Sequence, residues 1–139
     1  MLQFYFLSIL LNLVTGLILY FVDSNGQESV SETKIPPIVY DETFRLILGI
    51  LTAVTGLFKL LSAVRGDVPV VGDLLPALAG LIGGFVILYE YYKNRSRDEV
   101  ENVNASVFFQ KMIAGKKYIG IVCMVAAICH FLFPTVLFL

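Results

Sequence analysis

The chain has 139 residues, of which 58% are hydrophobic and only 15% are charged, and its mean hydropathy is +0.82. A soluble domain carries about 25% charged residues and cannot hide such an apolar surplus in one core, so the composition argues against a soluble fold. The net charge of −1 leaves no basic excess for nucleic acid. One histidine and two cysteines do not supply four ligands for a metal site, and we expect no cofactor.

Four apolar runs are long enough to cross about 30 Å of hydrocarbon, which takes about 20 helical residues. We predict transmembrane helices at about 2–22, 43–64, 74–92 and 118–139. The first and last runs contain no Asp, Glu, Lys or Arg, and the middle two carry such charges only near their ends, where long basic side chains reach the headgroups. The sequence therefore predicts an all-α integral membrane protein, with residues 1–139 forming a single polytopic domain.

The first run is also where a secretory signal would lie. It lacks a basic segment before it and an A-x-A cleavage site after it. We therefore interpret it as a retained helix.

A polar connection separates the third and fourth predicted spans. Ser96 followed by Glu99 matches a capping box, and the apolar residues Val100, Val103 and Val107 then fall on one helical face together with Phe108. This pattern predicts a short amphipathic helix at about 97–114 that lies in the membrane interface. The alternative is a helical arm in water.

Orientation follows from the Lys and Arg residues near the ends of the spans. Eight of them flank the side shared by the first and third connections, namely Lys34, Arg45, Lys93, Arg95, Arg97, Lys111, Lys116 and Lys117. Two, Lys59 and Arg65, flank the other side. This bias predicts that the first and third connections are cytoplasmic and that both termini are extracytoplasmic.

Two candidate charge pairs lie at matched depths in the predicted hairpin of the second and third spans. Arg45, at the start of the second span, is level with Glu90, near the end of the third. Lys59 is level with Asp67 and Asp73 at the opposite side. Ionisable residues in membrane segments are functional suspects, so these groups can line an ion or proton path. The alternative is snorkelling combined with edge salt bridges.

Small residues are concentrated in the same hairpin. They are Gly49, Ala53 and Gly56 on the second span, and Ala79, Gly80, Gly83 and Gly84 on the third. The small-xxx-small spacing permits close approach of two helix backbones. The pattern leaves open whether the contact forms within one chain or between two copies.

Two polar side chains are expected near the bilayer midplane, Asn12 in the first span and His130 in the fourth. Each is costly if it faces lipid. Pro134 lacks the N–H that would bond the His130 carbonyl, so it leaves that acceptor available. We predict a polar locus that acts as a proton relay, a ligand contact or an axial ligand, or that forms a single interhelical hydrogen bond.

The runs FRLILGILTAVTGLFKLL and LPALAGLIGGFVILYE, residues 44–61 and 75–90, resemble the opening hairpin of DoxX-like four-helix membrane proteins. The resemblance rests on the Arg-xxx-Gly and Gly-xx-Lys-Leu spacings. Here the hairpin is second and third in order, whereas the similar proteins open with it, so the resemblance transfers no function.

The sequence contains no recognisable catalytic motif, and we expect no enzyme. Arg45 and Glu90, with the nearby tyrosines, can instead bind an anionic headgroup or anchor the helices at the interface. The leading hypothesis is a non-catalytic small membrane protein that acts as a subunit or self-associating scaffold. Its expected partners are the lipid bilayer, further copies of itself or other membrane subunits. The alternative hypothesis is a subunit of an oligomeric small-solute or ion transporter or channel.

Overall fold

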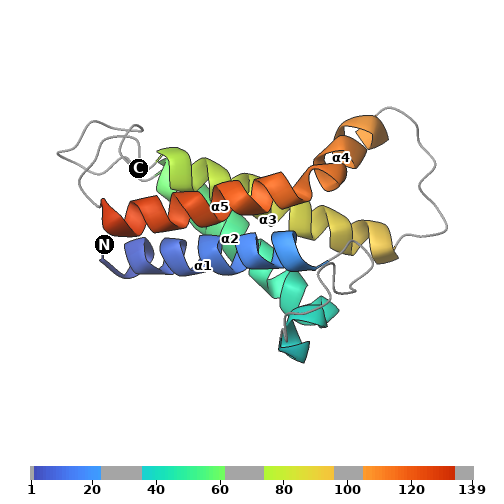
Figure 1. Ribbon diagram of the computed structural model, residues 1–139, viewed down its shortest axis with the longest axis horizontal. Helices are drawn as coiled ribbons and strands as arrows, with labels where there is room; N and C mark the ends of the chain where they lie inside the picture. Colours follow the sequence, from blue (N-terminus) through green and yellow to red (C-terminus); the bar gives the residue numbers. More distant parts are fainter. Residues whose placement is uncertain (1, 23–35, 62–73, 96–104, 134–139) are drawn as a thin grey trace.

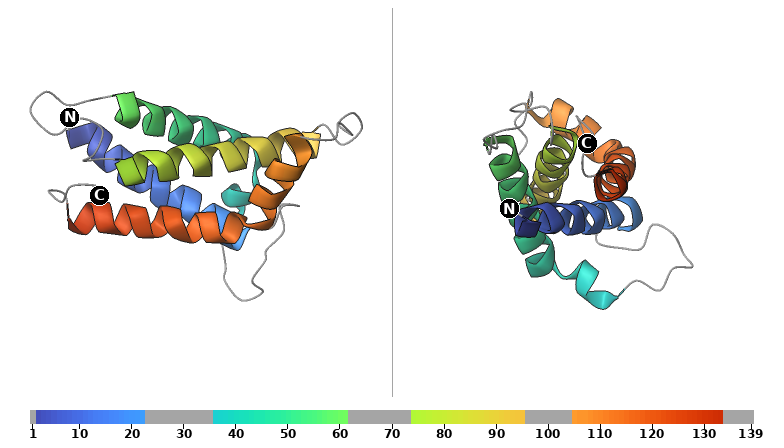
Figure 2. Two further views of the ribbon diagram at one scale, coloured as in Figure 1. Left: turned by 90° about the horizontal axis from the view of Figure 1, so that it is seen from above. Right: turned by 90° about the vertical axis from the view of Figure 1, so that its left-hand side faces the viewer.

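The computed structural model describes residues 2–22, 36–61, 74–95 and 105–133. Within these ranges the chain forms five α-helices and one short 3₁₀ helix, and no strand. In chain order they are α1 (Leu2–Phe21), η1 (Pro37–Tyr40), α2 (Glu42–Leu61), α3 (Leu74–Arg95), α4 (Ala105–Ala114) and α5 (Lys116–Leu132). The four long helices lie side by side, and α4 turns away from them at the end of the bundle where α3 finishes (Figures 1 and 2). The predicted all-helical class is confirmed for this part of the chain.

Two helices, α2 and α3, are long and apolar enough to cross a membrane, and α1 contributes a shorter apolar stretch, Tyr5–Phe21. Helix α5 has 17 residues. Residues 134–139, which were expected to complete the fourth span, lie outside the described ranges. Membrane association is therefore supported by two helices.

Helix boundaries differ from the predicted ones by a few residues. Helix α2 begins at Glu42 because the Asp41 carboxylate accepts the Thr43 N–H at 2.7 Å and the Phe44 N–H at 3.4 Å. It ends at Leu61, and the predicted continuation to residue 64 falls among residues that the structure does not describe. Helix α3 runs to Arg95, beyond the predicted end at 92, with basic residues in its last turn that favour the helix C-terminus.

The predicted interfacial helix is described only as α4, Ala105–Ala114. The capping pattern at Ser96 and Glu99 lies outside the described residues, as do Val100 and Val103. Met112 packs against the core of the bundle, whereas Val107 is 52% exposed and Phe108 is 65% exposed. The described part of the predicted apolar face therefore points away from the bundle.

Helices α2 and α3 are antiparallel and pack at backbone distance. A Cβ atom on Gly84 would lie 2.7 Å from the Ala53 nitrogen, and one on Gly56 would lie 2.8 Å from the Ala77 oxygen. A Cβ atom on Gly49 would lie 3.0 Å from the Leu88 side chain. These glycines therefore permit close approach within the chain, which is one of the two possibilities that the sequence left open.

The remaining small residues of α3 face two other helices. A Cβ atom on Gly83 would lie 2.9 Å from both Thr15 of α1 and Cys123 of α5. The carbonyl of Ala79 accepts a hydrogen bond from the Cys123 thiol at 3.3 Å, and Gly80 faces the Asn12 side chain. Helix α3 is thus in contact with α1, α2 and α5.

A second backbone contact, between α1 and α5, was not predicted from the sequence. Gly16 and Gly120 face one another, and a Cβ atom on either would lie 2.7 Å from the carbonyl oxygen of the other. Isolated glycines in two distant runs carry no spacing signal, so their pairing emerges only from the fold.

Apolar side chains lie both inside and outside the bundle. The interior holds one cluster formed by Leu11, Ile18, Leu19, Val22, Leu48, Val86 and Ile87. Exposed apolar side chains cover the outward faces of all four long helices, for example Phe6, Leu10, Ile50, Phe58, Phe85, Val122, Val125 and Phe131. Such coverage is unusual for a soluble monomer.

Candidate functional site

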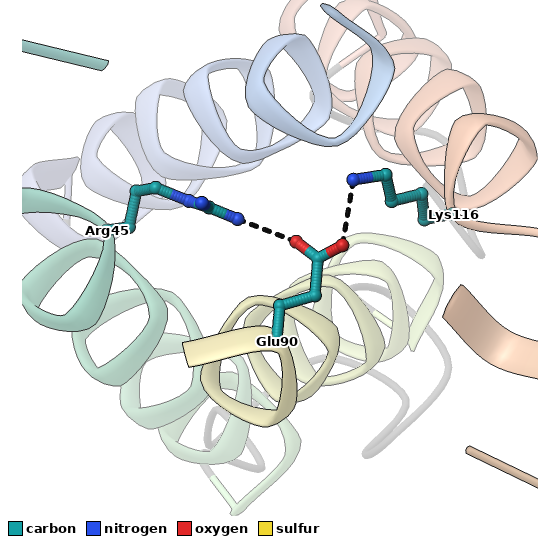
Figure 3. A network of polar contacts seen from close by, with 3 residues as sticks. All are labelled: Arg45, Glu90 and Lys116. Atoms are coloured by element: carbon teal, nitrogen blue, oxygen red, sulfur yellow. Dashed lines mark hydrogen bonds and ion pairs between the residues drawn. The ribbon is translucent and has the colours of Figure 1, made fainter. Parts of the chain in front are cut away.

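Three charged side chains meet inside one end of the bundle, and we refer to Arg45, Glu90 and Lys116 as the charge cluster. Arg45 Nη2 donates to Glu90 Oε2 at 2.7 Å, and Lys116 Nζ donates to Glu90 Oε1 at 2.7 Å. Figure 3 shows the two cations reaching the carboxylate from opposite sides, from α2 and α5. The cluster therefore joins three helices through a single carboxylate.

All three members of the charge cluster are buried. Arg45 is 4% exposed, Glu90 is 2% exposed and Lys116 is 3% exposed. Charges taken out of water are costly unless they are paired in good geometry. Short, charge-assisted bonds to both carboxylate oxygens meet part of this requirement.

Helix boundaries explain why these residues meet. Arg45 lies in the first turn of α2, directly after the Asp41 cap, and its backbone N–H donates to Asp41 O at 3.1 Å. Glu90 lies near the end of the antiparallel α3, and Lys116 is the first residue of α5. The structure thus brings together the Arg45 and Glu90 side chains that depth matching had paired.

Lys116 was missed as a partner because the fourth span was expected to begin at Tyr118. The available signal was a lysine immediately before an apolar run, at the same depth as Glu90. Gly115 separates α4 from α5, and its N–H donates to the Lys111 carbonyl at 3.0 Å. This turn allows α5 to begin early enough to place Lys116 inside the bundle.

An apolar layer lies one turn deeper than the charge cluster. Leu48 follows Arg45 by one turn on α2, and Ile87 precedes Glu90 by one turn on α3. Both belong to the interior cluster with Leu19 of α1. Beyond it the hydroxyls of Thr15 and Thr52 are hydrogen bonded at 2.9 Å.

Asn12 forms the next interior polar contact. Its Nδ2 donates to the Pro76 carbonyl at 3.0 Å, and the side chain is 2% exposed. Its Oδ1 is buried and has no hydrogen-bond partner among the described residues. A Cβ atom on Gly80 would lie 3.0 Å from this oxygen.

His130 lies near the end of the bundle opposite the charge cluster, in the described part of α5; its expected midplane position depends on a span continuing through residues 134–139, which lie outside the described ranges, and stays a prediction. It is in the last turn of α5, and its Nε2 is 2.7 Å from Lys59 Nζ. The Tyr5 ring lies 4.5 Å from the imidazole, centroid to centroid. Because Asn12 contacts Pro76 instead, the structure separates the two residues that were expected to form one polar locus.

The His130 carbonyl accepts a hydrogen bond from the Tyr5 hydroxyl. Pro134, which was expected to leave this carbonyl available, lies outside the described residues. So do Asp67 and Asp73, the predicted partners of Lys59. Among the described residues, Lys59 Nζ contacts the His130 imidazole and also lies over the Tyr5 ring, 5.5 Å from its centroid.

Metal ligation finds no support in the described ranges, where no three His, Cys, Asp or Glu side chains are close enough to hold an ion. The charge cluster has a different chemistry, because two cations share one anion. It can fix the relative positions of helices, and it offers N–H donors to an anionic group.

A protein-family model matches residues 1–130 of the chain. The chain is also 34% identical over 139 residues to an uncharacterized protein of Treponema pallidum (strain Nichols), covering 100% of both chains. It therefore belongs to the same family as that protein. No solved structure matches the chain.

Proposed function

We propose that the chain is a four-span integral membrane protein that acts without catalysis, as a subunit or self-associating scaffold of a membrane assembly. The proposed spans are α1, α2, α3 and the apolar run predicted at about 118–139, which includes most of α5. Both termini are extracytoplasmic in this proposal. The bilayer and other membrane chains, including further copies of this one, are the proposed partners.

The distribution of side chains carries the membrane part of the proposal. Apolar residues cover the outward faces of the four long helices, whereas charged and amide side chains such as Glu90 and Asn12 lie inside. Water would penalise the outward apolar surface, and lipid would penalise outward charges. A hydrocarbon environment satisfies both constraints.

The proposed orientation is supported by charges at the two ends. The basic end, where α3 finishes and α5 begins, carries exposed Lys93, Arg95, Lys111 and Lys117 in addition to the charge cluster. At the opposite end, the described residues include one basic side chain, Lys59. The positive-inside rule places the basic end in the cytoplasm.

The subunit role is supported by how the chain uses its interfaces. The glycines of α2 and α3 are in contact with neighbouring helices of the same chain. The surface available to another protein is then the apolar outer face, which is the kind of surface that pairs with another membrane helix by dispersion contacts.

Extraction in a mild detergent, followed by mass measurement, tests this function. We expect carbonate-resistant membrane association and a particle larger than one chain plus its detergent. Release by carbonate would contradict the membrane proposal. A strictly monomeric particle, together with no cross-linked partner in intact membranes, would contradict the scaffold.

A transporter subunit is the second candidate, and interior polar residues favour it. Between the charge cluster and His130 lie the buried side chains of Ser8, Asn12, Thr15, Thr52 and Thr55. Together they place polar groups at several depths of the bundle. Proton or ion flux into vesicles containing the purified chain, abolished by Asn12→Leu and retained in Asn12→Gln, would favour transport over the scaffold.

A further inference from the structure

We propose that Arg45 and Lys116 form a binding site for a phosphate group at the basic end of the bundle. The phosphate can come from the headgroup of an anionic phospholipid or from free phosphate. The lipid source rests on the membrane insertion proposed above, whereas binding of free phosphate does not. Three observations carry the assignment, and they concern charge, hydrogen-bond donors and position.

The charge cluster contains two cations and one anion, so it carries an excess of one positive charge. All three side chains are buried, since none is more than 5% exposed. An uncompensated buried charge is strongly unfavourable, and the group either loses its charge or acquires a counter-ion. An anionic ligand beside Glu90 supplies that counter-ion.

Donors also outnumber acceptors in the cluster. A guanidinium has five N–H donors and an ammonium has three, yet within the described residues Arg45 and Lys116 each donate one bond, both to Glu90. Arg45 Nε is buried and has no hydrogen-bond partner among the described residues. A phosphate group provides several acceptor oxygens, and arginine binds phosphate in a forked geometry while lysine binds it as a point charge.

The position of the cluster agrees with the level of lipid phosphates. Arg45 is in the first turn of α2 and Lys116 begins α5, so both side chains lie near helix ends rather than at mid-depth. The exposed side chains of Tyr92, Lys93 and Lys117 surround this end. Basic pockets between spans at the cytoplasmic side are a common way of binding anionic headgroups.

The test compares thermal unfolding of the full chain in neutral detergent under matched ionic strength. Inorganic phosphate is compared with chloride, and micelles containing phosphatidylglycerol are compared with micelles containing phosphatidylcholine. We expect the anionic partner to raise the Tm by about 4 °C or more at saturation. A rise with both anions indicates a general phosphate site, and a rise with phosphatidylglycerol alone indicates a lipid site.

Adjacent lysines provide a matched control. Lys116→Gln removes a buried charge of the cluster, whereas Lys117→Gln removes an exposed charge one residue further along. We expect Lys116→Gln and Arg45→Gln to lose the Tm rise and Lys117→Gln to keep it. Equal loss in all three variants would show diffuse attraction to a basic surface and would overturn the proposal, as would no rise in the native chain.

Native mass spectrometry covers the case in which the buried variants fail to fold. The native chain is expected to retain phosphatidylglycerol in preference to phosphatidylcholine, and Lys117→Gln is expected to behave in the same way. No preference in either chain would overturn the lipid source, and absence of phosphate binding as well would overturn the site. Because oligomeric state is not used as a readout, a monomer that binds phosphate would contradict only the scaffold.

Discussion

Glu90 accepts hydrogen bonds from two buried cations that come from different helices. Its loss and the loss of either cation therefore have different consequences. Without the carboxylate, Arg45 and Lys116 remain as two like charges in a medium of low dielectric constant, where repulsion is poorly screened. Without Lys116, the pair formed by Arg45 and Glu90 is electrically balanced.

We expect Glu90→Gln to destabilise the bundle more than Lys116→Gln. Breaking a buried pair so that cations stay uncompensated costs about 3–5 kcal/mol, whereas losing one charge-assisted hydrogen bond costs about 1.5–3 kcal/mol. The midpoints of thermal unfolding in detergent measure the difference. The double variant Glu90→Gln with Lys116→Gln should be more stable than Glu90→Gln alone, because it removes one of the two uncompensated cations. Equal midpoints for the two single variants would contradict this account.

His130 and Lys59 allow a second comparison of single residues. The two nitrogens are 2.7 Å apart, so the imidazole accepts when the ammonium is charged. We expect His130→Gln to keep most of the stability, because a glutamine oxygen can accept the same bond. His130→Leu removes the acceptor, and we expect a loss of about 1 kcal/mol relative to His130→Gln.

The unfolding midpoints of the two His130 variants check this ordering. If His130 takes part in proton transfer, His130→Gln would lose a proton-coupled activity with the assembly intact. That result would place the transporter candidate ahead of the scaffold, because glutamine cannot exchange a proton in the range near pH 6.5 where an ordinary histidine titrates.

At the level of residues, the sequence was informative where depth alone decides a contact. Arg45 and Glu90 could be paired because both are charges near matched helix ends. The contact between Lys59 and His130 could not be predicted, because it depends on how α2 and α5 are placed around α1. Lys116 was missed for a smaller reason, namely a helix start that was expected two residues too late.

At the scale of helices, the glycines of α3 differ in what they face. A Cβ atom on Gly84 would meet backbone atoms of α2, with Ala53 N at 2.7 Å and Gly49 O at 2.9 Å. A Cβ atom on Gly80 would meet the end of the Asn12 side chain at 3.0 Å. Backbone cannot move aside as a side chain can, so the two positions tolerate a methyl group differently.

We therefore expect Gly84→Ala to be the more harmful of two chemically identical substitutions. Overpacking against backbone costs about 1–3 kcal/mol, whereas at Gly80 a small movement of Asn12 accommodates the methyl group. Both changes gain the same helix propensity, so that contribution cancels in the comparison. Thermal unfolding of the two variants is the measurement, and a lower midpoint for Gly80→Ala would contradict the assigned packing.

The helices themselves could be predicted better than their contacts. Long apolar runs predict the existence of α1, α2, α3 and α5, because in the proposed hydrocarbon environment each span must satisfy its backbone hydrogen bonds internally. Their ends depend on local chemistry such as the Asp41 cap and the Gly115 turn. The pairing of Gly16 with Gly120 depends on the order in which the helices surround one another, which no local pattern specifies.

For the whole molecule, the arrangement places the two antiparallel pairs, α2 with α3 and α1 with α5, around a shared interior. Thr15 and Thr52 connect α1 with α2, and Cys123 and Ala79 connect α5 with α3. The charge cluster joins α2, α3 and α5 at the basic end, and His130 and Lys59 join α5 and α2 at the other. Polar contacts thus connect the helices at both ends and at mid-depth.

The two ends of this bundle must face opposite sides of a membrane if the proposed four spans are right. Gln110 of α4 is exposed at the basic end, and Leu61, the last residue of α2, is 69% exposed at the opposite end. The native cysteines, Cys123 and Cys129, are replaced by alanine so that a single introduced cysteine reports each end. Gln110→Cys and Leu61→Cys are then treated with a membrane-impermeant thiol reagent in intact cells.

We expect Leu61→Cys to react from outside and Gln110→Cys to react only after the membrane is opened, because the proposed orientation keeps the basic end in the cytoplasm. Cysteines placed at Ser31 and Ser106, in the first and third connections, should behave like Gln110→Cys. Labelling of Gln110→Cys from outside and protection of Leu61→Cys would reverse the orientation and leave the spans in place. Labelling of both positions from outside would show that α3, which connects them, does not cross the membrane. That result would contradict the four-span arrangement.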